Sequence, residues 1–116
     1  MLDLSRFDAL EWDDEEDEAG NWAHCSRAGH LGADPGRVLS QVLREEPVEF
    51  TMEVRTAEFS VVGPDASWSR YWVVLLDTSS RRGDWLRPVT GWAAGPNAMA
   101  AWRAGRPGGT GKVWLT

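Results

Sequence analysis

The spacing of apolar residues in the first half of the chain predicts two helices. The first spans about residues 19–28, where Trp22 and Cys25 share one side of a helix at a spacing of three. His24 and Arg27 share another side at the same spacing. Because the tryptophan side is the apolar one, we expect Cys25 to face the core and the histidine and arginine to face outward.

A second helix is predicted from Asp34 to about Glu46. Asp34 is a favourable N-cap, and Pro35 falls at the first helical position, where its missing N–H leaves no hydrogen bond unmade. The apolar stripe of this helix consists of Val38, Leu39, Val42 and Leu43. Pro47 ends the helix because proline cannot continue the hydrogen-bond pattern.

After Pro47 the apolar period shortens to two, which predicts strands. The run "RYWVVLLD" is apolar on both faces and is therefore expected to be central in a sheet. Pro88, in the last run, indicates an edge strand or a bulge. The predicted strands are Val48–Val54, Ala57–Gly63, Arg70–Asp77 and Trp85–Ala94.

A short last helix is predicted after Pro96. Its apolar positions are Ala98, Met99, Ala101 and Trp102. Residues 104–116 form a glycine- and proline-rich tail, and a chain of 116 residues is expected to be a single domain, 1–116, with its core over about 10–103. The predicted fold class is α+β in two layers, with helices on one face of an antiparallel sheet of three to four strands.

The charge of the chain is concentrated in one block. The formal net charge is −6, but seven carboxylates fall within residues 11–18, so the remainder sums to +1. That remainder contains eleven arginines, whose planar guanidinium groups suit phosphate or carboxylate. Two interpretations of the block remain open: a solvated charged run, or a segment that covers the basic surface of the same chain.

Candidate chemistry starts from the stretch "NWAHCSRAGH". His24, Cys25 and His30 are one ligand short of a four-ligand zinc site, so neither a metal nor another cofactor is expected. A lone cysteine favours a reducing compartment, and no run approaches the roughly 18 apolar residues of a membrane span. We therefore expect a cytoplasmic protein without a membrane partner.

Phosphate chemistry fits the residues better. Cleavage of RNA through its own 2′-hydroxyl requires a proton acceptor, a proton donor and cations near the phosphate. The candidate residues for this chemistry are His24, Arg27, Arg70 and Arg87.

The order of motifs along residues 10–103 resembles the BrnT-type toxins, which belong to the RelE-like group of small bacterial toxins. The segments that carry the resemblance are "LEWD" (10–13), "HCSRAG" (24–29), "VLSQVL" (38–43), "EFSVVGPD" (58–65), "RYWVVLLD" (70–77), "RPVTGWAA" (87–94) and "NAMAAW" (97–102). The resemblance implies a RelE-like fold, an RNA substrate, metal-independent endoribonuclease activity in the cytoplasm, and an antitoxin as protein partner.

The resemblance also assigns roles. His24 and Arg27 match the helix motif, Arg70 matches the strand arginine, and Arg87 matches the arginine that precedes Thr90. By analogy, Arg70 and Arg87 hold the scissile phosphate and Arg27 stabilises its developing charge. His24 or His30 then transfers a proton.

Two departures from the motif keep an alternative open. Ala28 stands where the family has a histidine, and the stretch after Thr90 has Arg103 as its one basic residue before the tail. The alternative is a protein-interaction module that has lost its catalytic set. Its candidate contact residues are Trp68, Trp92 and Trp102.

Overall fold

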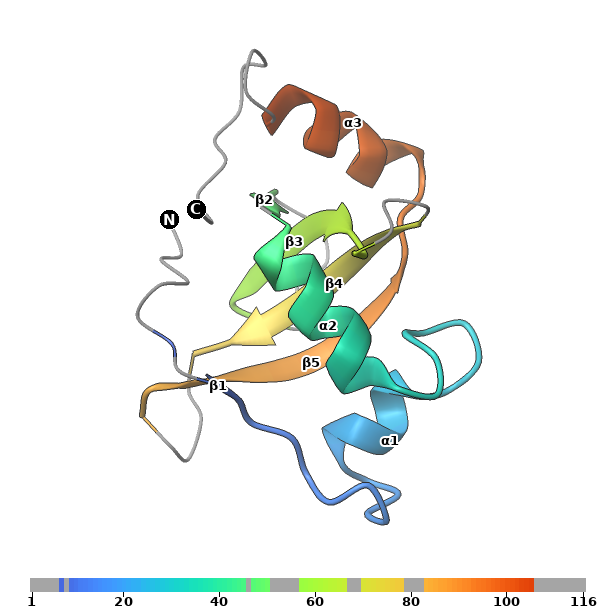
Figure 1. The fold of residues 1–116 in the computed structure, drawn as a ribbon, viewed down its shortest axis with the longest axis vertical. Helices are drawn as coiled ribbons and strands as arrows, with labels where there is room; N and C mark the ends of the chain where they lie inside the picture. The colour runs from blue at the N-terminus through green and yellow to red at the C-terminus, as the bar shows by residue number, and fades with distance from the viewer. Residues whose placement is uncertain are drawn as a thin grey trace.

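The computed structural model describes residues 7, 9–45, 47–50, 57–66, 70–78 and 83–105. Within these residues the chain forms an α+β fold of five strands and three helices (Figure 1). The elements are β1 (Ala9–Leu10), α1 (Asn21–Cys25), α2 (Pro35–Arg44), β2 (Val48–Glu49), β3 (Phe59–Pro64), β4 (Tyr71–Asp77), β5 (Trp85–Ala93) and α3 (Pro96–Gly105). The outer part of the predicted first strand (51–54), Trp68 and the tail beyond Gly105 lie outside the described residues.

The sheet has the strand order β1-β5-β4-β3-β2. Strands β2 to β5 form the predicted antiparallel meander, but β1 pairs in parallel with the start of β5, where Ala9 lies opposite Trp85 and Leu10 opposite Leu86. The expectation of three to four antiparallel strands is therefore wrong: the sheet formed by the described residues is mixed and has five strands. The alternation in "LEWD" is compatible with a short strand, but it does not indicate the partner of that strand, which lies about 75 residues further along the chain.

Strand β4 is central, as its apolar run predicted, because β3 and β5 flank it on both sides. The bulge indicated by Pro88 is also present. Leu75 lies opposite Thr90 and Leu76 opposite Pro88, so Val89 is the extra residue of β5.

Helices cover both faces of the sheet. Leu39 and Val42 of α2 pack in one cluster with Val74 of β4, whereas Trp102 of α3 packs in a second cluster with Val73. Successive strand residues point to opposite faces, so α3 lies on the face away from α2. The expectation of helices on one face is therefore wrong, because β4 is apolar on both faces and each face needs cover. Figure 1 shows α2 across the sheet and α3 at the end opposite α1.

The ends of the first two helices differ in how well the sequence predicts them. Asp34 caps α2 as expected, accepting a hydrogen bond from the backbone N–H of Arg37 at 3.2 Å. Helix α1 is shorter than the predicted 19–28, because the chain turns back after Cys25 and the backbone N–H of Leu31 bonds to the Cys25 carbonyl at 2.8 Å. Gly29, with a φ of 84°, lies within that turn.

Candidate functional site

Side chains from α1 and the following turn cover the outer edge of β5. Strand β1 pairs only with the first two residues of β5, so the next carbonyls need other donors. The hydrogen bonds that reach this edge are Asn21 Nδ2 to the Pro88 carbonyl (2.9 Å), Cys25 Sγ to the Val89 carbonyl (3.9 Å) and His30 Nδ1 to the Gly91 carbonyl (2.9 Å). The edge is thus closed by side chains where β1 ends.

Cys25 is a structural thiol. Its side chain is fully buried among the residues that α2 packs against, and it forms no disulfide. Burial raises the pKa of its thiol to about 11, so it stays protonated and unreactive. The prediction that Cys25 faces the core is confirmed.

Both histidines of the chain converge on Thr90 of β5. Nε2 of His24 lies 3.0 Å from the Thr90 hydroxyl oxygen, and Nδ1 of His30 lies 3.2 Å from the same atom. The two imidazole rings are 4.6 Å apart between centroids. Three groups that can carry a proton therefore lie in one chain of contacts.

The hydrogen-bond partners of His30 and Thr90 bear on which group donates a hydrogen in this row of contacts. The Gly91 carbonyl can only accept, so Nδ1 of His30 carries a hydrogen. Nε2 of His24 lies within reach of the Thr90 hydroxyl, so a neutral His24 can accept the Thr90 hydrogen there. Burial, the nearby His30 and the nearby Arg27 all lower the pKa of His24 and favour this neutral form.

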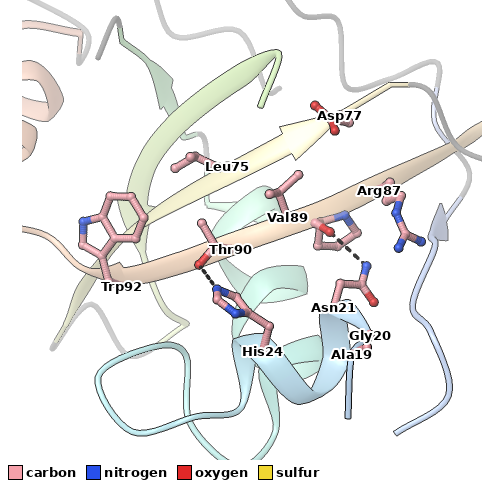
Figure 2. Close-up of a pocket in the computed structure, with 11 residues that line it drawn as sticks. Ala19, Gly20, Asn21, His24, Leu75, Asp77, Arg87, Val89, Thr90 and Trp92 are labelled. Carbon is pink, nitrogen blue, oxygen red and sulfur yellow. Dashed lines mark hydrogen bonds between the residues drawn. The ribbon is translucent and has the colours of Figure 1, made fainter. Parts of the chain in front are cut away.

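The His24–Thr90 contact forms one wall of a pocket of about 730 Å³ (Figure 2). Leu75 and Val89 form its apolar part, Trp92 lies at one end, and Asp77 and Arg87 lie toward the other. Leu75 belongs to the cluster beneath α3, so this pocket opens on the α3 face of the sheet.

A second pocket, of about 300 Å³, contains the predicted arginines Arg27 and Arg70 together with His30. Trp72 and Ala93 also line it. Because Ala93 follows Trp92 directly along β5, the two pockets lie on opposite faces of the strand. The histidine pair lies at the edge between them.

Neither arginine of the smaller pocket is neutralised by a carboxylate of the described residues. The guanidinium carbon of Arg70 lies 4.7 Å from the centre of the Trp72 ring, and Arg27 donates a hydrogen bond to the Glu18 backbone carbonyl at 3.4 Å. The side chains of both are exposed. Both guanidinium groups are therefore available to an anion.

Arg87 is held differently. One of its terminal nitrogens lies 3.0 Å from Glu11 Oε1, and the other lies 2.8 Å from Asp13 Oδ2. The hydrogen bonds that Arg87 donates to Asp13 and Glu11 raise its pKa. Asp13 also exchanges hydrogen bonds with Asn21 through the backbone N–H of each residue, at 2.8 and 2.9 Å. We refer to this cluster, Arg87 with Glu11, Asp13 and Asn21, as the Arg87 clamp.

The acidic block is therefore not uniform. Glu11 is buried and Asp13 half-buried, and both serve the Arg87 clamp, whereas residues 14–18 are exposed. This corrects the interpretation of the whole block as one solvated run. The first two carboxylates have a partner that only tertiary structure reveals.

The four candidate residues predicted from the sequence divide between the two pockets. His24 lines the larger pocket with Arg87, and Arg27 and Arg70 line the smaller one. Thr90, at which the histidines meet, was visible only as the threonine that follows Arg87 in "RPVTG". Ala28, the departure from the motif, is exposed, and His30 reaches the site instead.

Within the described residues, no group of three or more His, Cys, Asp or Glu side chains is placed to hold a metal ion. No helix in those residues is long and apolar enough to cross a membrane. Comparison of the chain with protein-family models, with curated proteins and with solved structures gives no match. The interpretation of the site therefore depends on its own geometry.

Proposed function

We propose that this protein is a metal-independent endoribonuclease of the toxin type, with a RelE-like fold and an antitoxin as its partner in the cytoplasm. The observation that carries the proposal is the convergence of His24 and His30 on Thr90, beside two arginines that no carboxylate of the described residues neutralises. Neutral imidazole, imidazolium and guanidinium are the groups that RNA cleavage requires when no metal is present.

In the proposed reaction the ribose 2′-oxygen attacks phosphorus and the bond from phosphorus to the 5′-oxygen breaks. The 2′ proton passes to the Thr90 hydroxyl oxygen while the Thr90 hydrogen passes to Nε2 of His24, 3.0 Å away. Protonated His30 donates from Nε2, which has no partner among the described residues, to the departing 5′-oxygen. The products are a 2′,3′-cyclic phosphate end and a 5′-hydroxyl end.

The arginines divide between two roles. Arg27 and Arg70 bind the phosphate and offset the charge that develops on it. Arg87, to which the resemblance assigns the phosphate, instead joins the segment before α1 to β5 through Glu11 and Asp13. In this proposal Arg87 is a positioning residue for the site.

The proposal is tested with purified protein and a labelled single-stranded RNA in the presence of EDTA. We expect the wild type to cleave, leaving cyclic phosphate ends, and His24→Ala to lower the rate by about 100-fold or more. Arg37→Ala, an exposed arginine on α2, is the matched control and should cleave like the wild type. Folded wild-type protein that leaves every RNA intact would overturn the proposal.

A second candidate function is the interaction module. It is favoured by half-buried apolar residues that pack against the cluster beneath α3, which include Val89, Trp92 and Met99. Trp102 does not belong to such a surface, because it is 5% exposed and packs against the ring of Tyr71 at 5.5 Å. A protein ligand whose binding is lost in Met99→Asp, from a chain that does not cleave RNA, would favour this candidate.

A further inference from the structure

Trp92 differs from the other tryptophans that the structure describes. Trp12 and Trp22 pack edge to face at 5.2 Å, Trp102 packs on Tyr71, and Trp72 lies beneath Arg70. Trp85 also has an interaction of its own. Among the described tryptophans, the Trp92 side chain alone has no aromatic ring, guanidinium or hydrogen-bond partner.

The surroundings of Trp92 suit a flat ligand. The residue is half-buried, and its ring stands at one end of the larger pocket beside the apolar side chains of Leu75 and Val89 (Figure 2). Trp92 and Thr90 lie on the same face of β5, two residues and hence about 7 Å apart. An aromatic ring without a partner therefore stands one strand repeat from the hydroxyl that connects the histidines.

We propose that Trp92 is the stacking platform for an unpaired nucleobase. This inference rests on the proposed function and names its substrate class, single-stranded RNA. The ribose of the stacked nucleotide lies over Thr90, and its phosphate passes the edge of β5 toward Arg27 and Arg70 on the other face. Charge complementarity supports this path, since the phosphate enters the pocket of Arg27 and Arg70, which no carboxylate in the described part of the chain neutralises.

Two consequences follow for substrate choice. A base in a duplex is already stacked and paired, so double-stranded RNA should be a poor ligand. Stacking on an aromatic side chain tolerates every base, because each base has an aromatic face, so the subsite should discriminate strand state more than sequence.

The test measures binding rather than cleavage, with single-stranded 2′-O-methyl RNA, which lacks the attacking hydroxyl. Trp92→Leu keeps an apolar side chain but removes the aromatic face, and should weaken binding by about 5- to 100-fold. Trp92→Phe keeps the aromatic face and should bind within about threefold of the wild type. Arg37→Ala should bind like the wild type.

A set of ligands with one abasic position each locates the contact. At the stacked position the missing base should weaken binding to the wild type but not to Trp92→Leu, which is the coupling expected of a direct contact. Equal losses in both proteins at every position, or unchanged binding by Trp92→Leu, would overturn the stacking proposal.

The two proposals can fail separately. Binding that depends on Trp92, in a protein that never cleaves unmodified RNA, would remove the ribonuclease and keep the base subsite. Cleavage by the wild type, together with abasic ligands that lose equal affinity for the wild type and Trp92→Leu, would keep the ribonuclease and remove the base subsite. A wild type that binds no single-stranded RNA would remove both.

Discussion

The arginines of this protein meet two different environments. The guanidinium of Arg87 is bonded to Glu11 and Asp13, and Glu11 is 4% exposed. The guanidinium groups of Arg27 and Arg70 line a pocket without a carboxylate of the described residues as partner. At one end of α1 an arginine therefore completes a structural cluster. At the other end, two arginines stay available to an anion.

The difference shows that residue type does not determine role here. Buried carboxylates require a cation, and Arg87 supplies it, so its charge is already compensated within the fold. Arg27 and Arg70 compensate no buried carboxylate of the described residues. The stability of the fold therefore does not explain why both line the same pocket. Loss of Arg87 should therefore affect stability first, and loss of Arg27 or Arg70 should affect binding and catalysis first.

The largest expected effect is on stability, at the Arg87 clamp. Arg87→Met keeps the apolar stem but leaves Glu11 and Asp13 without their cation, which should cost about 3 kcal/mol of the free energy of unfolding. Arg70→Met should cost less than about 1 kcal/mol. Urea unfolding of the two variants measures both.

A compensating variant sharpens this test. Adding Glu11→Gln and Asp13→Asn to Arg87→Met removes the buried charges, so part of the lost stability should return. Equal stability losses in Arg87→Met and Arg70→Met would remove the distinction between the two arginine environments.

The next largest effect concerns Thr90. Thr90→Val removes the hydroxyl and keeps the shape of the side chain, so the proton path to His24 is broken and RNA cleavage should fall by about 100-fold. Thr90→Ser restores the hydroxyl and should recover most of the rate. A serine variant as slow as the valine variant would show that Thr90 acts through packing alone.

The pH dependence of cleavage should follow His24. The pKa of His24 is lowered from about 6.5, the ordinary value for histidine, so His24 stays neutral at pH 6.5. The cleavage rate should decline only when the pH falls through this lowered pKa. Arg27→Gln removes one of the charges that lower this pKa, so the decline should move to higher pH. A pH–rate profile that is identical in both proteins would contradict the assignment of His24 as the acceptor.

The same shift affects stability. The folded state binds fewer protons at His24 than the unfolded chain does, so its contribution to stability is lost as the pH falls from about 6.5 through the lower, folded-state pKa. His24→Gln should remove this part of the pH dependence. Unfolding in urea at several pH values measures it.

The smallest expected effect belongs to the exposed acidic residues. Asp14→Asn, Glu15→Gln and Glu16→Gln together leave the Arg87 clamp intact and keep the oxygen of residue 14 that accepts the Glu16 backbone N–H. Affinity for single-stranded RNA should rise by about two- to fivefold at low salt and the gain should vanish at high salt. Unchanged affinity at low salt would exclude a screening role for residues 14–16.

The sequence predicts the locally determined parts of the fold. Asp34 and Pro35 mark the start of α2, the two-sided apolar run marks β4 as central, and Pro88 marks the bulge. Each of these depends on a few neighbouring residues. The parallel pairing of Ala9 with Trp85 has no local signal, because its partners are distant in the chain.

The candidate site divides in the same way. Helical spacing places Cys25 in the core and the motif order selects Arg27 and Arg70, whose shared pocket the structure contains. The Arg87 clamp and the contact of His24 with Thr90 depend on how α1 and the residues just before it lie along β5. Such contacts are set by tertiary packing, so residue type and spacing alone could not distinguish Arg87 from the other two arginines.

The most direct test of the central claim is the RNA cleavage rate of Arg70→Ala, measured with its free energy of unfolding on the same preparation. We predict that the rate falls by about 100-fold or more while the free energy of unfolding stays within about 1 kcal/mol of the wild type. A variant that cleaves at the wild-type rate, or one whose lost activity is matched by lost stability, would contradict the account.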